Sequence, residues 1–62
     1  MKYREGRHIQ RLDLIRTDDG YLGRVVHVGE WCVTVEHCDE TGEYIYQMMY
    51  LDPSDLIYIP EI

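Results

Sequence analysis

Apolar and polar residues alternate along much of residues 20–50, and two short turn-forming sequences interrupt the alternation. A period of two is typical of β-strands, because successive side chains on a strand point to opposite faces. Gly29-Glu30 fits a two-residue hairpin loop with glycine first, and Asp39-Glu40-Thr41-Gly42 fits a longer turn. The pattern therefore predicts three consecutive antiparallel strands, at residues 20–28, 31–38 and 43–50.

These two turns fix a register and divide the side chains of the predicted strands between two faces. With Gly29-Glu30 as the loop, Val28 lies opposite Trp31, and the second turn brings Cys38 opposite Glu43. The face with the larger apolar set is expected to form the core. Its members are Val26, Val28, Trp31, Val33, Val35, Tyr46, Met48 and Tyr50. The opposite, mixed face carries Val25, His27, Cys32, Thr34, Glu36, Ile45, Gln47 and Met49.

The N-terminal residues are expected to differ from the remainder. Residues 1–10 show neither helical nor strand periodicity, which predicts a partly disordered arm whose end at Ile9 packs on the domain formed by residues 11–62. Residues 11–16 alternate well enough to form a first strand, with both of its leucines on one side.

The C-terminal residues supply the last strand. Pro53 fixes its own φ angle within residues 51–56, which predicts a short 3₁₀ turn, and residues 57–59 form a strand that ends at Pro60. Five short strands with no helix to cover them favour closure into a barrel, which also removes exposed edges. The predicted fold is therefore an all-β, five-stranded barrel with a short 3₁₀ turn before the last strand.

This layout resembles the SH3-like barrel family. The resemblance is carried by the first strand, the Gly20-Tyr21-Leu22-Gly23-Arg24-Val25 sequence, the Gly29-Glu30 hairpin and the turn at residues 51–56. Residues 20–28 look most like the KOW motif of ribosomal and transcription-elongation proteins, and the aromatic-rich remainder is similar to Tudor-type modules. The resemblance implies a barrel over residues 11–60 and, as one function, regulation of transcription or translation.

Charge is distributed unevenly along the chain. The formal net charge is −6, yet all six Lys and Arg residues lie within the first 24 positions. From residue 25 onward there are eight acidic residues and no Lys or Arg, so this part repels phosphate. Contact with nucleic acid is expected only through Arg4, Arg7 and Arg11. The asymmetry also fits a basic protein partner, head-to-tail association of copies, or complementarity within one molecule.

Signals for catalysis, a metal or a membrane are weak. His27 and Cys32 are predicted cross-strand neighbours, but a mid-strand cysteine lacks the activating turn or helix end, and there is no Cys-x-x-Cys spacing. We therefore expect no enzyme and no metal or other cofactor. No apolar run approaches the length of a membrane span, and Cys32 and Cys38 lie too far apart on one strand to bridge. Reduced thiols favour a cytoplasmic location.

Two sets of side chains are candidates for binding. An apolar stripe on the mixed face is typical of a protein contact or a dimer interface. This stripe contains Val25, His27, Cys32, Ile45, Gln47 and Met49. Aromatic residues near strand ends form the second set, because Tudor-type barrels hold a cation against ring faces there. This possible aromatic cage contains Tyr21, Trp31, Tyr50 and Tyr58.

Length favours self-association. At 62 residues the chain is close to the lower limit for burying a sufficient core without help. We expect a small, non-enzymatic protein-interaction module that forms homo-oligomers and offers an acidic surface to a protein partner. The alternative is a KOW- or Tudor-like regulator that reads nucleic acid through its N-terminal segment.

Overall fold

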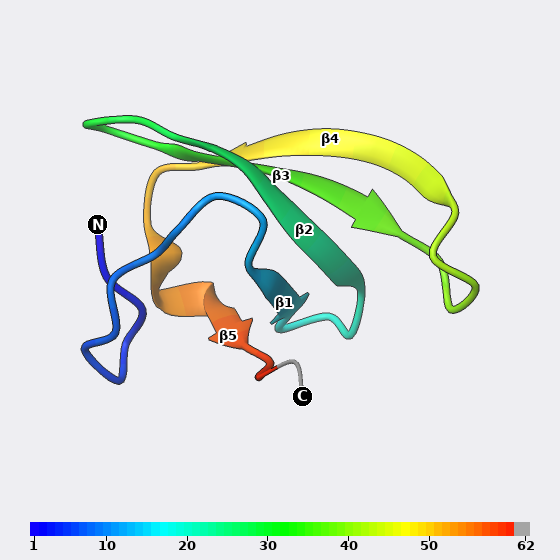
Figure 1. The fold of residues 1–62 in the computed structure, drawn as a ribbon, viewed down its shortest axis with the longest axis horizontal. Helices are drawn as coiled ribbons and strands as arrows, with labels where there is room; N and C mark the ends of the chain where they lie inside the picture. Colours follow the sequence, from blue (N-terminus) through cyan, green and yellow to red (C-terminus); the bar gives the residue numbers. More distant parts are fainter. Residues whose placement is uncertain (61–62) are drawn as a thin grey trace.

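The computed structural model describes residues 1–60, which form one five-stranded antiparallel sheet (Figure 1). Its elements are β1 (Leu14–Thr17), β2 (Leu22–Val28), β3 (Val33–Cys38), β4 (Tyr44–Tyr50), the 3₁₀ turn η1 (Pro53–Asp55) and β5 (Leu56–Tyr58). The predicted all-β class, the five strands and the 3₁₀ turn before the last strand are confirmed.

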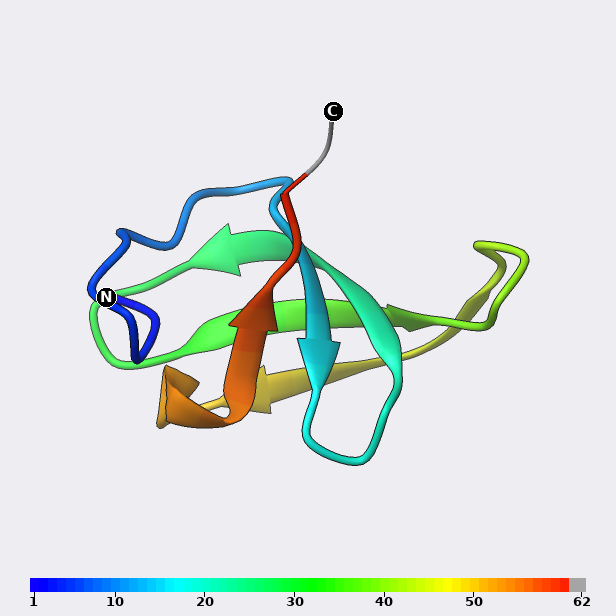
Figure 2. The ribbon, with the colours of Figure 1, turned by 90° about the horizontal axis from the view of Figure 1, so that it is seen from below.

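The sheet is strongly curved but not closed. Its strand order is β4-β3-β2-β1-β5, so β4 and β5 are its two edges and do not pair with each other. Figure 2 shows β1 and β5 side by side, running across the three longer strands. The predicted closure, which would have removed both edges, is therefore not present in the described residues.

The hairpin between β2 and β3 turns one residue later than the alternation predicts. The Gly29 N–H donates a 2.8 Å hydrogen bond to the Cys32 carbonyl, which leaves Glu30 and Trp31 in the loop. Trp31 therefore lies at the hairpin tip, where its relative exposure is 80%. The prediction that Trp31 belongs to the core is wrong.

A β-bulge in β2 determines which of its side chains are buried. Pairing steps from His27 opposite Thr34 to Val25 opposite Val35, so that Val26 is an extra residue in β2. The extra residue reverses the alternation on its N-terminal side. Val25, which was predicted on the outer face, is completely buried, and Val26 is only partly buried. Both face assignments are therefore corrected.

The core lies between β2–β3 and the β1–β5 pair. Its buried apolar residues are Tyr3, Ile9, Ile15, Val25, Val33, Val35 and Leu56. In β1 the inward residues are Ile15 and Thr17, one position away from the leucines that the alternation selects. Leu12 precedes the strand, has a positive φ of 77°, and is 55% exposed.

Residues 1–10 pack on the sheet through Tyr3 as well as through Ile9, whose packing was predicted. The Tyr3 N–H donates to the Arg7 carbonyl at 2.9 Å, and both Tyr3 and Ile9 are buried. The Tyr3 hydroxyl donates a 2.9 Å hydrogen bond to the Asp13 carboxylate. Burial, together with this carboxylate, raises the pKa of Tyr3 well above its usual range.

β4 pairs with β3 two residues away from the predicted register, with Met48 rather than Tyr46 opposite Val35. A shift of two keeps the same side chains on the same face. Nevertheless Tyr46 is 38% and Met48 48% exposed, because the rest of the sheet does not cover this edge. The prediction that these two side chains are core residues is wrong, whereas Val33 is buried as predicted.

Gly23 provides a test of the packing between β1, β2 and β3. A Cβ atom at this position would lie 2.5 Å from Val35 Cγ1 and 3.2 Å from Ile15 Cδ1. Because overpacking a core costs about 1–3 kcal/mol, we expect Gly23→Ala to lower the free energy of unfolding by about 2 kcal/mol in urea titrations. In the double variant Gly23→Ala, Val35→Ala the clashing methyl is absent. The double variant should lose less unfolding free energy than the two single variants lose together. Additive losses would refute the proposed clash.

Candidate functional site

His37 in β3 is a buried titratable residue with three tyrosines around it. It is 1% exposed, and its ring stacks on Tyr46 of β4 with 4.6 Å between centroids and 10° between planes. Tyr21 approaches the imidazole edge-on at 6.2 Å. The Tyr50 hydroxyl and His37 Nε2 share a hydrogen bond of 2.7 Å. We call these four residues the histidine–tyrosine cluster.

The β1–β2 turn positions Tyr21. Thr17 N–H donates to the Tyr21 carbonyl at 2.9 Å, and the Tyr21 N–H donates to Thr17 Oγ1 at 3.1 Å. Thr17 Oγ1 also donates to the Asp19 carboxylate. Gly20 completes the turn with φ of 95°, a conformation that glycine adopts without steric cost. The turn thus fixes both an aromatic ring and a carboxylate beside β3.

Burial favours the neutral forms of two residues of the histidine–tyrosine cluster, His37 and Tyr50. Burial disfavours the imidazolium ion and lowers the pKa of His37, against the opposing effect of the Asp19 carboxylate. Burial, with smaller contributions from neighbouring negative groups, raises the pKa of Tyr50. Among the described residues, His37 Nδ1 is a buried polar atom without a hydrogen-bond partner.

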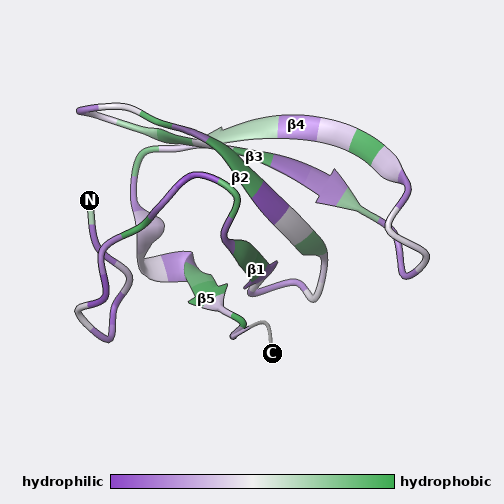
Figure 3. Ribbon diagram, viewed as in Figure 1, coloured by the Kyte–Doolittle hydropathy of each residue, from purple (hydrophilic) through white to green (hydrophobic). Residues whose placement is uncertain are grey.

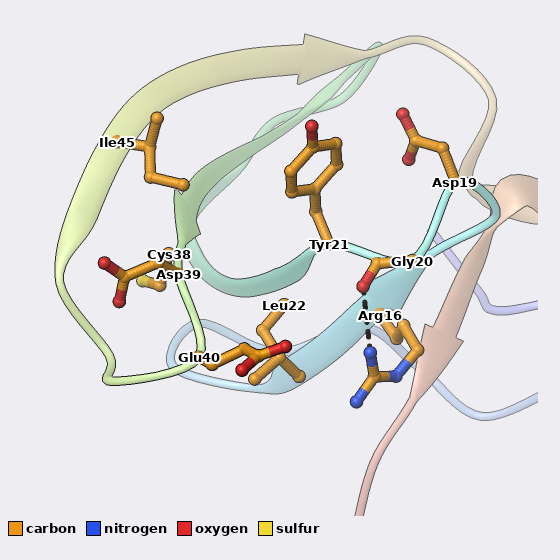
Figure 4. Close-up of a pocket in the computed structure, with 9 residues that line it drawn as sticks. All are labelled: Arg16, Asp19, Gly20, Tyr21, Leu22, Cys38, Asp39, Glu40 and Ile45. Carbon is orange, nitrogen blue, oxygen red and sulfur yellow. Dashed lines mark hydrogen bonds between the residues drawn. The ribbon is translucent and has the colours of Figure 1, made fainter.

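An open pocket of about 620 Å³ lies where the β1–β2 turn faces the β3–β4 turn (Figure 4). Figure 4 shows Tyr21 and Ile45 on facing sides of this space, while Arg16 donates a 2.9 Å hydrogen bond to the Gly20 carbonyl. Ile45 reaches the pocket because it is the extra residue in a bulge of β4. The remaining lining residues are Asp19, Leu22, Cys38, Asp39 and Glu40.

The carboxylate of Asp39 at the rim of the pocket serves the β3–β4 turn. It accepts hydrogen bonds from the Thr41 N–H at 2.9 Å, the Thr41 hydroxyl at 2.6 Å and the Glu43 N–H at 2.9 Å. These bonds, led by that from the Thr41 hydroxyl, lower the pKa of Asp39. A structural role therefore accounts for this carboxylate.

The structure divides the predicted aromatic cage between separate places. Tyr21 and Tyr50 both contact His37, but Trp31 lies at the hairpin tip. Tyr58 packs against Tyr3, with 5.5 Å between ring centroids. Sequence reasoning missed Tyr46 as a cluster residue, because the predicted register placed a different tyrosine opposite His37.

The three arginines proposed for nucleic-acid contact are exposed, but Arg7 is engaged with an aromatic ring of the chain and Arg4 lies near the Asp52 carboxylate. Arg7 Cζ lies 4.2 Å above the centre of the Tyr58 ring, and its Nε is 3.6 Å from the Glu5 carboxylate. A guanidinium on an aromatic face is a stabilising cation–π contact. Arg7 thus ties the N-terminal segment to β5.

The predicted interface stripe is also divided. Val25 is buried, whereas Ile45 lines the pocket and is 46% exposed. His27 lies opposite Thr34 instead of Cys32, which corrects their predicted cross-strand pairing. Gln47 and Met49 remain exposed together on β4. In the described part of the chain, no three His, Cys, Asp or Glu side chains form a group suited to a metal ion.

Exposed apolar side chains concentrate along the free edge of the sheet. Of the ten large hydrophobic residues exposed in the described residues, six lie within residues 44–51, which contain no charged residue. They are Tyr44, Ile45, Tyr46, Met48, Met49 and Leu51. We call residues 44–51 the β4 edge. Within residues 1–60 β4 pairs only with β3, so no described strand lies along the outer side of its backbone.

Comparisons of the chain with family models, with curated proteins and with solved structures gave no match. No helix in the described part of the chain has the length and apolar content needed to cross a membrane. The candidate site is therefore defined by the geometry of this chain alone: the β4 edge, with the histidine–tyrosine cluster on its inner side.

Burial of His37 predicts a pH-dependent stability. The unfolded chain takes up a proton on this residue below its ordinary pKa of about 6.5, whereas the folded protein resists protonation. The free energy of unfolding should therefore be greatest, as far as His37 determines it, above pH ~7. It should decrease as the pH falls through about 6. Thermal melts between pH ~7.5 and ~5.5 measure this. His37→Phe keeps a stacked ring without the titration, so its melting temperature should vary less. Equal pH slopes in both proteins would refute the assignment.

Proposed function

We propose that this protein is a small, non-enzymatic interaction module that binds polypeptides through the β4 edge. The observation that carries the proposal is the coincidence of a free strand edge with six exposed apolar side chains and no charge. A free edge accepts an extended segment through backbone hydrogen bonds, and alternate side chains of the added strand give specificity.

The composition of the β4 edge supports this proposal. Edge strands that stay unpaired usually carry proline, or lysine or another charged residue, which discourages association. Residues 44–51 have none of these, although 29% of the chain is charged. The bulge at Ile45 interrupts the edge near one end only. Figure 3 shows β4 at the outer margin of the molecule, with hydrophobic parts separated by a more hydrophilic middle.

The pocket beside β4 suggests how a bound segment is selected. A strand added to β4 places its inward side chains near Tyr46 and the pocket mouth, which Asp19, Asp39 and Glu40 border. These acidic groups favour a basic side chain in the partner. The engagement of Arg7 with Tyr58 favours this function over nucleic-acid binding through the N-terminal arginines.

Two further parts of the proposal concern ancestry and location. The five strands with a 3₁₀ turn before the last support an SH3-like origin. The two free cysteines, Cys32 and Cys38, support a reducing, cytoplasmic environment.

Peptide selection tests the binding surface. Peptides selected from a random phage-displayed library on the wild-type protein should bind Met49→Lys at least about tenfold more weakly, because the charge lies on the edge that they cover. Ile57→Lys is the matched control, since Ile57 is an exposed apolar residue of the opposite edge strand, 58% exposed against 68% for Met49. Fluorescence anisotropy gives the affinities, and NMR locates the perturbed amides. Peptides that bind Met49→Lys as well as wild type, or that perturb amides outside β4 and its pocket, would overturn the proposal.

A further inference from the structure

The β4 edge has a composition and register suited to a second copy of this chain. We infer that two copies pair their β4 strands antiparallel, about a two-fold axis that passes beside Met48, and form a continuous ten-stranded sheet. This inference rests on the proposed function, because it uses the same edge and names its occupant.

The position of the axis follows from the regular part of β4. Each residue from Tyr46 to Tyr50 has its own partner in β3, whereas the bulge at Ile45 disturbs the strand before them. Met48 is the middle residue of this regular segment. In an antiparallel pair formed by a two-fold axis, the middle residue lies opposite its own copy. The axis therefore brings the two Met48 side chains together.

The same axis pairs the other regular positions without conflict. Gln47 lies opposite Met49 of the second copy, and Tyr46 lies opposite Tyr50. Opposed residues of an antiparallel pair share a face, and these pairs satisfy that condition because their members are an even number of residues apart. Aromatic and apolar cross-strand pairs of this kind stabilise a sheet. The exposed side chains of Ile45 and Leu51 flank the paired segment.

Charge favours this contact over others between identical chains. Each copy has a formal net charge of −6, so most pairs of surfaces repel. The regular segment from Tyr46 to Tyr50 contains no charge, and the nearest acidic residues, Glu43 and Asp52, lie outside it. Like charges directly across a strand pair, which would destabilise it, are therefore avoided.

The second copy also covers surface that the single chain leaves in water. Tyr46 and Met48 lie on the face of β4 that continues the core, yet both remain substantially exposed. Pairing at the edge places the equivalent residues of the second copy beside them. Burial of apolar surface in this way favours association, which suits a chain of 62 residues with a small core of its own.

A charge exchange at Met48 tests the inference. Met48→Glu and Met48→Lys each place two like charges at the axis, so each variant alone should dimerise at least about tenfold more weakly than the wild type. An equimolar mixture of the two should recover a dimer, because the glutamate of one copy then faces the lysine of the other. Sedimentation velocity measures the dissociation constants, and native mass spectrometry identifies the heterodimer. Ile57→Glu, on the other edge strand, is the matched control and should dimerise like the wild type.

Ionic strength gives an independent readout. Association of two negatively charged copies through an uncharged edge should strengthen between about 50 mM and about 500 mM NaCl, because salt screens their repulsion. Head-to-tail contact between the basic N-terminal segment and the acidic remainder should weaken over the same range. Weakening with salt would therefore overturn the inference.

The other outcomes separate the inference from the proposed function. A wild-type protein that is monomeric at about 1 mM overturns the second copy as occupant, while peptide binding that depends on Met49 still supports the interaction module. A dimer that persists in both Met48 variants, or a mixture that forms no heterodimer, overturns the axis. Circular dichroism melts establish that the variants fold. If the Met48 variants do not fold, Met49→Glu replaces them, since Met49 is 68% exposed and lies opposite Gln47 of the second copy. The dimer of this variant must also be weaker than that of the wild type.

Discussion

One extra residue in β2 determines the inside and the outside of this protein. The bulge at Val26 lets Val25 face the core opposite Val35. Beyond the bulge, toward the hairpin, the inward and outward positions of β2 are exchanged. On the N-terminal side of the bulge Gly23 also faces inward, where the absence of a side chain allows Ile15 and Val35 to approach. If the pairing continued without a bulge, Val26 and Arg24 would face the core instead, and burying a guanidinium there is highly unfavourable.

The same arrangement explains why one edge of the sheet stays open. The two strands that cross the longer ones, β1 and β5, have four and three residues, whereas β4 has seven. These short strands cover β2 and most of β3, so the valines of β3 are buried while Tyr46 and Met48 of β4 are not. His37 lies at the boundary between the covered and uncovered regions, which is why its ring is enclosed by tyrosines and not by aliphatic side chains.

The alternation of residues predicted the strands well because it reflects a local property of each strand. The 3₁₀ turn was also predictable, since Pro53 restricts its own backbone. The register of the β2–β3 hairpin was not predictable. The predicted loop, Gly29-Glu30, and the observed loop, Glu30-Trp31, differ by one position, and this shift moves every cross-strand pair. Hydrophobicity favoured Trp31 as a core residue, yet the hydrogen bond between Gly29 and Cys32 places it at the tip.

The candidate site was predictable only in part for a related reason. Gln47 and Met49 were assigned to an exposed stripe from the alternation alone, and they do lie on the β4 edge. That β4 would be an edge at all depends on the strand order, which no local pattern of the chain specifies. Predicting the cluster around His37 would have required the β3–β4 register. Predicting the burial of Tyr3 would have required knowledge of contacts across nearly the whole chain.

The contact between Tyr3 and Tyr58 has a consequence for the order in which the chain folds during synthesis. These rings join positions near the two ends of the sequence, and Arg7 rests on the same tyrosine. During synthesis on a ribosome, the N-terminal segment has no docking surface until β5 has left the exit tunnel. The N-terminal segment therefore completes its packing only after the last strand has formed. Until then the nascent β2–β4 meander exposes its valines, at a stage when a chaperone has its best opportunity to bind.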